Sequence, residues 1–174
     1  SILNSGTVNV IQQGVQEQQR VGRKATIKSM HIRYLISLPE QDAVATPATG
    51  DTVRVIVYQD KQANGATAAV TDILQDAEIH SFRNLVNSGR FIIHLDKLHN
   101  INYDGLGSDN AGVVSQAFKG FNYTFNKKCN IPIEYSSTTG AIGEIRSNNL
   151  GILVISNQGV AGFFSKVRLR FSDQ

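Results

Sequence analysis

The sequence is divided into short segments with β-strand character, each bounded by Gly, Asn, Asp, Ser or Pro. Val and Ile together number 32, whereas Leu and Met number 12. This excess favours strands, because β-branched side chains are stiff at χ1 and pack well on a pleated surface. We predict eight strands, at residues 7–13, 25–38, 52–60, 90–99, 117–128, 130–135, 150–156 and 163–171.

Helical patterns are scarce. Residues 68–76 and 81–86 could each form a short helix, but neither is long or amphipathic enough to make a layer of the fold. No repeat or Pro-rich linker divides the 174 residues, so we expect one domain spanning residues 1–174. Eight strands with long irregular links predict an all-β antiparallel sandwich, and Greek-key or jelly-roll wiring accommodates such links.

Two of the predicted strands show how their faces differ. In residues 52–60, Val53, Val55 and Val57 share one face, which we expect to be the mainly buried one. In residues 163–171 the apolar face alternates with Lys166, Arg168 and Arg170. These three cations form either an ordinary solvated surface, an edge protected by charge, or a stripe that faces a polyanion.

Charge is distributed unevenly along the chain. The net charge of +3 is too small to establish a nucleic-acid partner, but residues 1–35 carry +4, residues 36–118 carry −5 and residues 119–174 carry +4. Opposite charges on different faces would suit either polyanion binding or self-association. No apolar run is long enough to span a membrane and no leader pattern is present, so we expect no membrane partner.

Candidate sites for chemistry are few. His94 and Asp96 share a strand face but His99 falls on the other, so a two-histidine, one-carboxylate metal site is incomplete. Cys129 follows two lysines at an expected corner between strands and has no nucleophile signature. Asp104 and Asp109 flank a glycine-rich turn, which is either a plain turn or a calcium site. None of the familiar phosphate-binding or hydrolase motifs occurs, so nothing nominates an enzyme.

A resemblance extends over nearly the whole chain. It is carried by ILNSG at residues 2–6, QRVGRKATIKSMHIR at 19–33, VRVIVYQDKQANG at 53–65, TDIL at 71–74, GRFIIHLDK at 89–97, GILVI at 151–155 and VRLRF at 167–171. In this order the segments resemble the single jelly-roll coat proteins of small icosahedral viruses. That group includes satellite plant viruses such as satellite tobacco necrosis virus, and the circular Rep-encoding single-stranded DNA viruses.

The resemblance implies an eight-stranded antiparallel jelly roll with one or two short helices in its loops. It also implies a structural protein, not an enzyme, that assembles with copies of itself into an icosahedral shell around a single-stranded genome. Circular DNA is the expected genome, and the coat protein of a satellite RNA virus is one alternative. A β-sandwich ligand-binding module, lectin-like in kind, is a second alternative, and a cupin-like enzyme with a histidine-rich metal centre is a third. The protein would belong to a virion assembled in the host nucleus or cytoplasm, with a receptor that stays unidentified.

The resemblance also suggests where the partners would bind. Residues 53–60 and the last strand belong to one sheet in that family, so Arg54, Lys166, Arg168 and Arg170 would line the inner wall and contact phosphates. Arg20, Arg23 and Lys24 form a second basic group that faces either the genome or a neighbouring subunit. No cofactor is expected, with calcium bound by Asp104 and Asp109 between subunits as the alternative. The links at 39–51, 65–89, 100–116 and 136–149 would form most subunit contacts, and an arginine-rich arm would precede the first strand.

Overall fold

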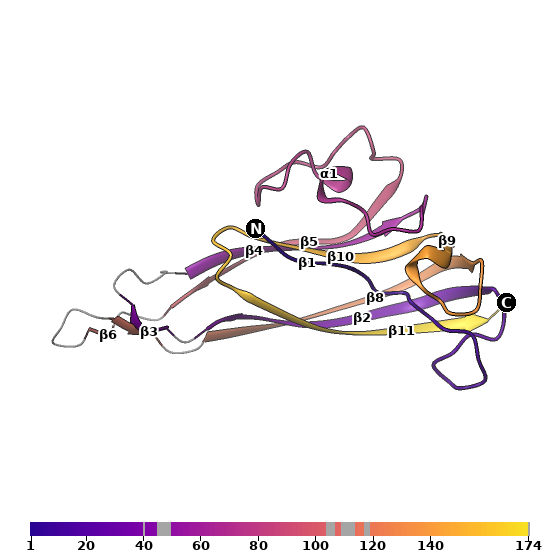
Figure 1. Ribbon diagram of the computed structural model, residues 1–174, viewed down its shortest axis with the longest axis horizontal. Coiled ribbons are helices and arrows are strands. Elements are labelled where there is room, and N and C mark those ends of the chain that lie inside the picture. The colour runs from indigo at the N-terminus through magenta and orange to yellow at the C-terminus, as the bar shows by residue number, and fades with distance from the viewer. Residues whose placement is uncertain (40, 45–49, 104–106, 109–113, 117–118, 174) are drawn as a thin grey trace.

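The computed structural model describes residues 1–39, 41–44, 50–103, 107–108, 114–116 and 119–173. It contains two four-stranded antiparallel sheets that lie face to face (Figure 1). The first, the β4 sheet, has the order β1 (Ile2–Thr7), β10 (Asn149–Ser156), β4 (Gly50–Asp60) and β5 (Phe91–Asn102). The second, the β2 sheet, has the order β11 (Gly162–Asp173), β2 (Lys24–Leu38), β8 (Lys119–Tyr135) and β9 (Ile145–Ser147).

The remaining elements are short. β3 (Gln41–Val44), β7 (Val114–Gln116) and β6 (Gly107–Ser108) form a small third sheet at one end of the sandwich. In the described part of the chain, one α-helix, α1 (Val70–Ile73), and one 3-10 turn, η1 (Ile142–Glu144), lie in connections. No helix among the described residues is long and apolar enough to cross a membrane.

The strand order confirms the predicted all-β jelly-roll sandwich. Along the chain, the long strands switch from one sheet to the other at every connection except that between β4 and β5. This wiring places hydrogen-bonded neighbours far apart in sequence, as in the β10–β4 pair, where Ile152 lies opposite Val57. Long-range pairing of this kind is the mark of a jelly roll rather than a series of hairpins.

Several boundaries differ from the prediction. The first strand is Ile2–Thr7, not residues 7–13, because its backbone pairs with β10 despite a turn-like composition. The two strands expected on either side of Cys129 are one continuous strand, β8. Within residues 68–76 the helix is limited to α1, and residues 81–86 are mostly irregular instead of helical, with Arg83 forming an isolated β-bridge to Leu74.

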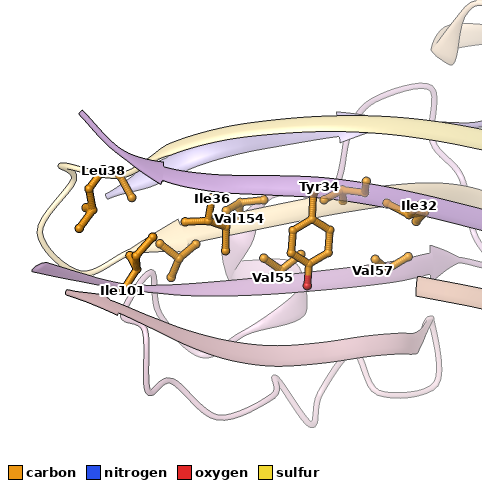
Figure 2. Packing of buried hydrophobic residues seen from close by; sticks show 11 residues of the cluster. Ile32, Tyr34, Ile36, Leu38, Val55, Val57, Ile101 and Val154 are labelled. Carbon is orange, nitrogen blue, oxygen red and sulfur yellow. The ribbon is translucent and has the colours of Figure 1, made fainter. Parts of the chain in front are cut away.

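The main core lies between the two sheets. Figure 2 shows Ile32, Tyr34, Ile36 and Leu38 of β2 facing Val55, Val57, Ile101 and Val154 of the β4 sheet. All these side chains are buried, which removes a large apolar area from water and is the dominant favourable contribution to such a fold. The alternate side chains of β2, including His31 and Arg33, therefore point to the opposite, outer face of the β2 sheet.

The outer faces of the two sheets are not equivalent. The connection from β4 to β5, which contains α1, lies over the β4 sheet (Figure 1). Its Val70 and Ile73 pack with Ile56 and Tyr58 of β4, so β4 is buried on both faces. The prediction that this strand is buried mainly on its valine side is therefore wrong, because this connection covers the other side. The β2 sheet keeps exposed side chains on its outer face.

Candidate nucleic-acid interface

Six cations gather on the outer face of the β2 sheet. β11 supplies three of them by its alternation, since Val167, Leu169 and Phe171 point inward and the residues between them point outward. Strand pairing sets Lys166 opposite Arg33, Arg168 opposite His31 and Arg170 opposite Ser29, while Ser29 in turn lies opposite Lys128. We call this surface the basic face and define it by its exposed cations Lys28, Arg33, Lys128, Lys166, Arg168 and Arg170.

Carboxylates do not neutralise the basic face. Among the described residues the structure has two ion pairs, Arg54 with Asp96 and Arg90 with Asp60, and neither includes a cation of this face. Two of its cations contact side chains other than carboxylates: Lys28 Nζ donates to Asn130 Oδ1 at 2.7 Å, and Arg33 Nε donates to His31 Nε2 at 3.3 Å. Six like charges without counter-charges produce a positive potential that attracts polyanions.

The basic face is hollowed rather than flat. A depression of about 570 Å³ is lined by His31, Arg33, Lys166, Val167 and Arg168. A second, of about 310 Å³, lies beside it and includes Lys128, Arg168 and Arg170 among its lining residues. The cations thus stand around shallow hollows that a phosphate backbone could follow.

The sequence predicted part of this surface. The outward orientation of Lys166, Arg168 and Arg170 is confirmed, and their binding of nucleic acid stays a prediction. Sequence reasoning missed Lys28, Arg33 and Lys128 as members of the same face. The sequence could have indicated Arg33, because apolar residues occupy the even positions from Met30 to Leu38. This alternation places the odd positions, including Arg33, on the outer face.

Arg54 does not belong to this surface. β4 and β11 lie in different sheets, so the expectation that Arg54 and the β11 cations line one wall is wrong. The Arg54 side chain is 10% exposed and makes a two-pronged ion pair with Asp96, with both nitrogen–oxygen distances 2.7 Å. Its third nitrogen donates to the carbonyl oxygens of Ile79 and Ser81, at 3.0 and 2.7 Å. The guanidinium therefore fixes the β4–β5 connection, and its hydrogen bonds are made mainly within the protein.

Arg20 is also buried. Its guanidinium is fully enclosed and donates to the carbonyl oxygens of Ile11, Gly22 and Ser137. This arrangement contradicts its expected place in an accessible basic group with Arg23 and Lys24. Those two residues are exposed, and Lys24 lies opposite Glu134 in the β2–β8 pair, so a carboxylate accompanies it. Both stay weaker candidates than the basic face.

The other predicted sites lie elsewhere. Asp104 and Asp109 fall outside the described residues, so calcium binding stays a prediction. His94 hydrogen-bonds with both ring nitrogens, to Gln59 Oε1 at 3.1 Å and to Lys127 Nζ at 2.9 Å. Burial, and then the adjacent Lys127 ammonium, lower the pKa of His94 to about 4, so the ring is neutral near pH 7.

His99 and Cys129 are likewise held by the fold. His99 Nε2 lies 2.8 Å from the Tyr34 hydroxyl, and burial followed by the charge of Lys97 lowers the pKa of His99. Cys129 lies within β8 rather than at a corner, and burial raises the pKa of its thiol. Within the described part of the chain, no three His, Cys, Asp or Glu side chains are grouped so that they could hold a metal ion.

The chain is similar in sequence to known viral coat proteins. The chain is similar to the coat protein of Maize white line mosaic Satellite virus, with 26% identity over 159 residues that cover 89% of this chain. The matched segment covers 66% of that coat protein, slightly less than two thirds of its length. A family model described as satellite tobacco necrosis virus coat protein matches residues 2–174. Because that match extends over nearly the whole chain, the chain belongs to the satellite tobacco necrosis virus coat protein family.

Proposed function

We propose that this chain is the structural subunit of a viral capsid, which assembles with its own copies into a closed icosahedral shell around a single-stranded nucleic acid. Membership of the coat protein family supports assembly into a virion. The observation that carries the nucleic-acid role is the basic face, whose six exposed cations take part in neither of the two ion pairs found among the described residues. In the shell this face is turned toward the cargo.

The mechanism is electrostatic and independent of base sequence. Lys and Arg side chains contact phosphates and release the counterions that surround a nucleic acid, so binding weakens steeply as salt rises. If about four to six of these cations each neutralise one phosphate, log K should fall with log salt at a slope of about −3 to −4 for a single strand. Repetition over many subunits makes weak individual contacts cooperative.

The nature of the genome is a separate part of the proposal. A satellite-virus coat protein was one of the alternatives that the sequence left open, and the family match favours it. Circular single-stranded DNA stays a prediction that the family match does not support. Treatment of purified particles with nuclease after disassembly separates the two, because RNase and DNase degrade different cargoes.

Assembly is tested by imaging and light scattering of the purified chain. The proposal predicts closed shells of uniform size. A chain that stays a monomer or small oligomer under all ionic conditions would overturn it, and would favour the β-sandwich ligand-binding module.

The inward role of the basic face is tested by charge reversal. Arg168→Glu with Arg170→Glu should reduce packaged nucleic acid while particles still form. The matched control is Lys61→Glu with Arg83→Glu, two exposed cations in the connection that covers the β4 sheet, which changes net charge equally. Equal packaging by the two double variants would show that another face holds the cargo.

A further inference from the structure

An exposed aromatic ring continues the line of cations on β11. Phe164 is 64% exposed and precedes Lys166 by two residues, so both side chains point outward from the β2 sheet. Positions two apart on a strand are separated by about 6.8 Å. Phe163, in the opposite phase, packs against the main core instead. Phe164 therefore lies at the end of the basic face rather than in an apolar cluster.

The ring borders a third depression in the same surface. This depression has a volume of about 440 Å³, and its lining includes Arg33, Leu35, Asn122, Thr124, Phe164 and Lys166. Strand pairing arranges these residues in two adjacent rows: Phe164 lies opposite Leu35, which lies opposite Asn122, and Lys166 lies opposite Arg33, which lies opposite Thr124. An aromatic ring, two cations and two neutral hydrogen-bonding side chains thus meet in one hollow.

We propose that this hollow is a base-stacking subsite for single-stranded nucleic acid. The Phe164 ring stacks on an unpaired base, and Arg33 and Lys166 neutralise the phosphates beside it. The amide of Asn122 and the hydroxyl of Thr124 are within the same hollow and can hydrogen-bond to the nucleotide without fixing its sequence. The subsite rests on the proposed function, because it extends the basic face that is assigned there to the cargo.

The chemistry of the hollow explains why a single strand is the expected ligand. Aromatic side chains bind unpaired bases through their π-faces, and every base offers such a face, so stacking tolerates any sequence. In a duplex those faces are already stacked on neighbouring bases and are not available. A neighbouring protein surface is the other conceivable occupant, but the cations and polar side chains around Phe164 are complementary to a phosphate chain rather than to an apolar patch.

The test separates stacking from phosphate contact. The 174-residue chain is titrated, at fixed low salt, with fluorescently labelled oligothymidylate and with an abasic strand that carries the same number of phosphates. The wild type should prefer the strand with bases by about 5- to 10-fold, the lower end of the range for one stacked base. Phe164→Ala should remove this preference and leave the affinity for the abasic strand unchanged, whereas Phe164→Tyr should retain it.

A control variant and the contrary results complete the test. Phe82→Ala removes a ring that is 77% exposed in the connection over the β4 sheet, and it should leave both affinities unchanged. The subsite is refuted if Phe164→Ala keeps the preference for bases, or if it weakens binding to both strands equally. If Arg168→Glu with Arg170→Glu leaves the abasic affinity unchanged, the basic face itself is wrongly assigned. If the wild type binds neither strand, both proposals fail.

Discussion

The guanidinium carbon of Arg20 lies 4.2 Å from the centroid of the Tyr135 ring. A cation of the connection between β1 and β2 therefore stacks on the last residue of β8. The Tyr135 hydroxyl donates to the carbonyl oxygen of Asn9 at 2.7 Å, which ties the same connection a second time. A buried charge is tolerated here because three carbonyl oxygens and an aromatic face replace water around it. Arg20 is therefore a structural residue at the end of the sandwich.

Replacement of Arg20 should destabilise the fold. Arg20→Lys keeps the charge, but one ammonium cannot reach three carbonyl groups arranged around a planar fork. We expect the free energy of unfolding to fall by about 2 to 3 kcal/mol, because buried acceptors lose their donors. Urea denaturation measures this change. Arg23→Lys, at an exposed neighbouring position, is the control and should stay within about 0.5 kcal/mol of the wild type.

Arg54 and Arg168 should affect different properties. Arg54→Gln breaks the ion pair with Asp96 and should lower stability by about 1 to 3 kcal/mol, with nucleic-acid affinity unchanged. Arg168→Gln removes an exposed cation and should lower affinity at low salt, with stability nearly unchanged. Denaturation measures the free energy of unfolding of each variant, and binding titration measures its nucleic-acid affinity. A loss of affinity in Arg54→Gln without loss of stability would restore Arg54 to the interface.

Close packing at Gly151 gives a third prediction. Gly151 lies opposite Tyr58 in the β10–β4 pair, and a Cβ at this position would overlap the phenol ring of Tyr58. Tyr58 is completely buried and has little room to move, so Gly151→Ala should destabilise the fold by about 1 to 3 kcal/mol. Thermal unfolding measures the effect. Gly89→Ala is the matched control, because no atom lies within 4 Å of its added Cβ, and an equal loss in both would contradict this explanation.

The carboxylate of Asp51 holds the turn between β10 and β11. It accepts hydrogen bonds from Ser156 Oγ at 2.6 Å and from the backbone N–H groups of Gln158, Val160 and Ala161 at 3.0, 3.1 and 2.9 Å. Burial alone would raise the pKa of Asp51, but these donors outweigh it and lower the pKa below its ordinary value of 3.8. The charged carboxylate is thus preferred in the folded state.

The sign of this shift fixes the pH dependence. Because the folded pKa lies below the unfolded one, the stabilisation is present above about pH 4 and is lost as pH falls through the folded pKa. Asp51→Asn should be less stable than the wild type at neutral pH, and the difference should shrink in acid. Urea denaturation from about pH 6 to pH 3 measures it. Glu17→Gln, at an exposed position, is the control, and a constant difference for Asp51→Asn would contradict the assignment.

The sequence predicted the face of β11 correctly because its alternation is regular from Lys166 to Phe171. Which residues of β2 face the core was harder to predict from the sequence. Its buried apolar residues change from odd positions, Ala25 and Ile27, to even positions from Met30 onward, at a register shift beside Lys28. Such an irregularity lets two apolar segments of different phase face one core, and period alone does not locate it.

The burial of Arg20 and Arg54 was beyond the sequence for another reason. Arg54 lies on the face of β4 opposite its core-facing valines. In an ordinary two-layer sandwich that face is exposed to solvent. The environment of Arg54 is made by Ile79, Ser81 and Asp96, which come from a distant connection and the next strand. A cation on a strand is available to a ligand only if no long connection covers it. The local spacing of residues does not show which strand face a distant connection will cover.

By itself the sequence determined the all-β class, most of the strands and the outward phase of Lys166, Arg168 and Arg170, because period-two patterning follows directly from strand geometry. Only the tertiary structure decided which strands share a sheet, and so which cations share a face. It joined Arg33 and Lys128 to the β11 cations, separated Arg54 from them and left one outer face uncovered. The physical reason is that sheet order is set by long-range backbone pairing and by burial over the whole molecule, which no segment specifies alone.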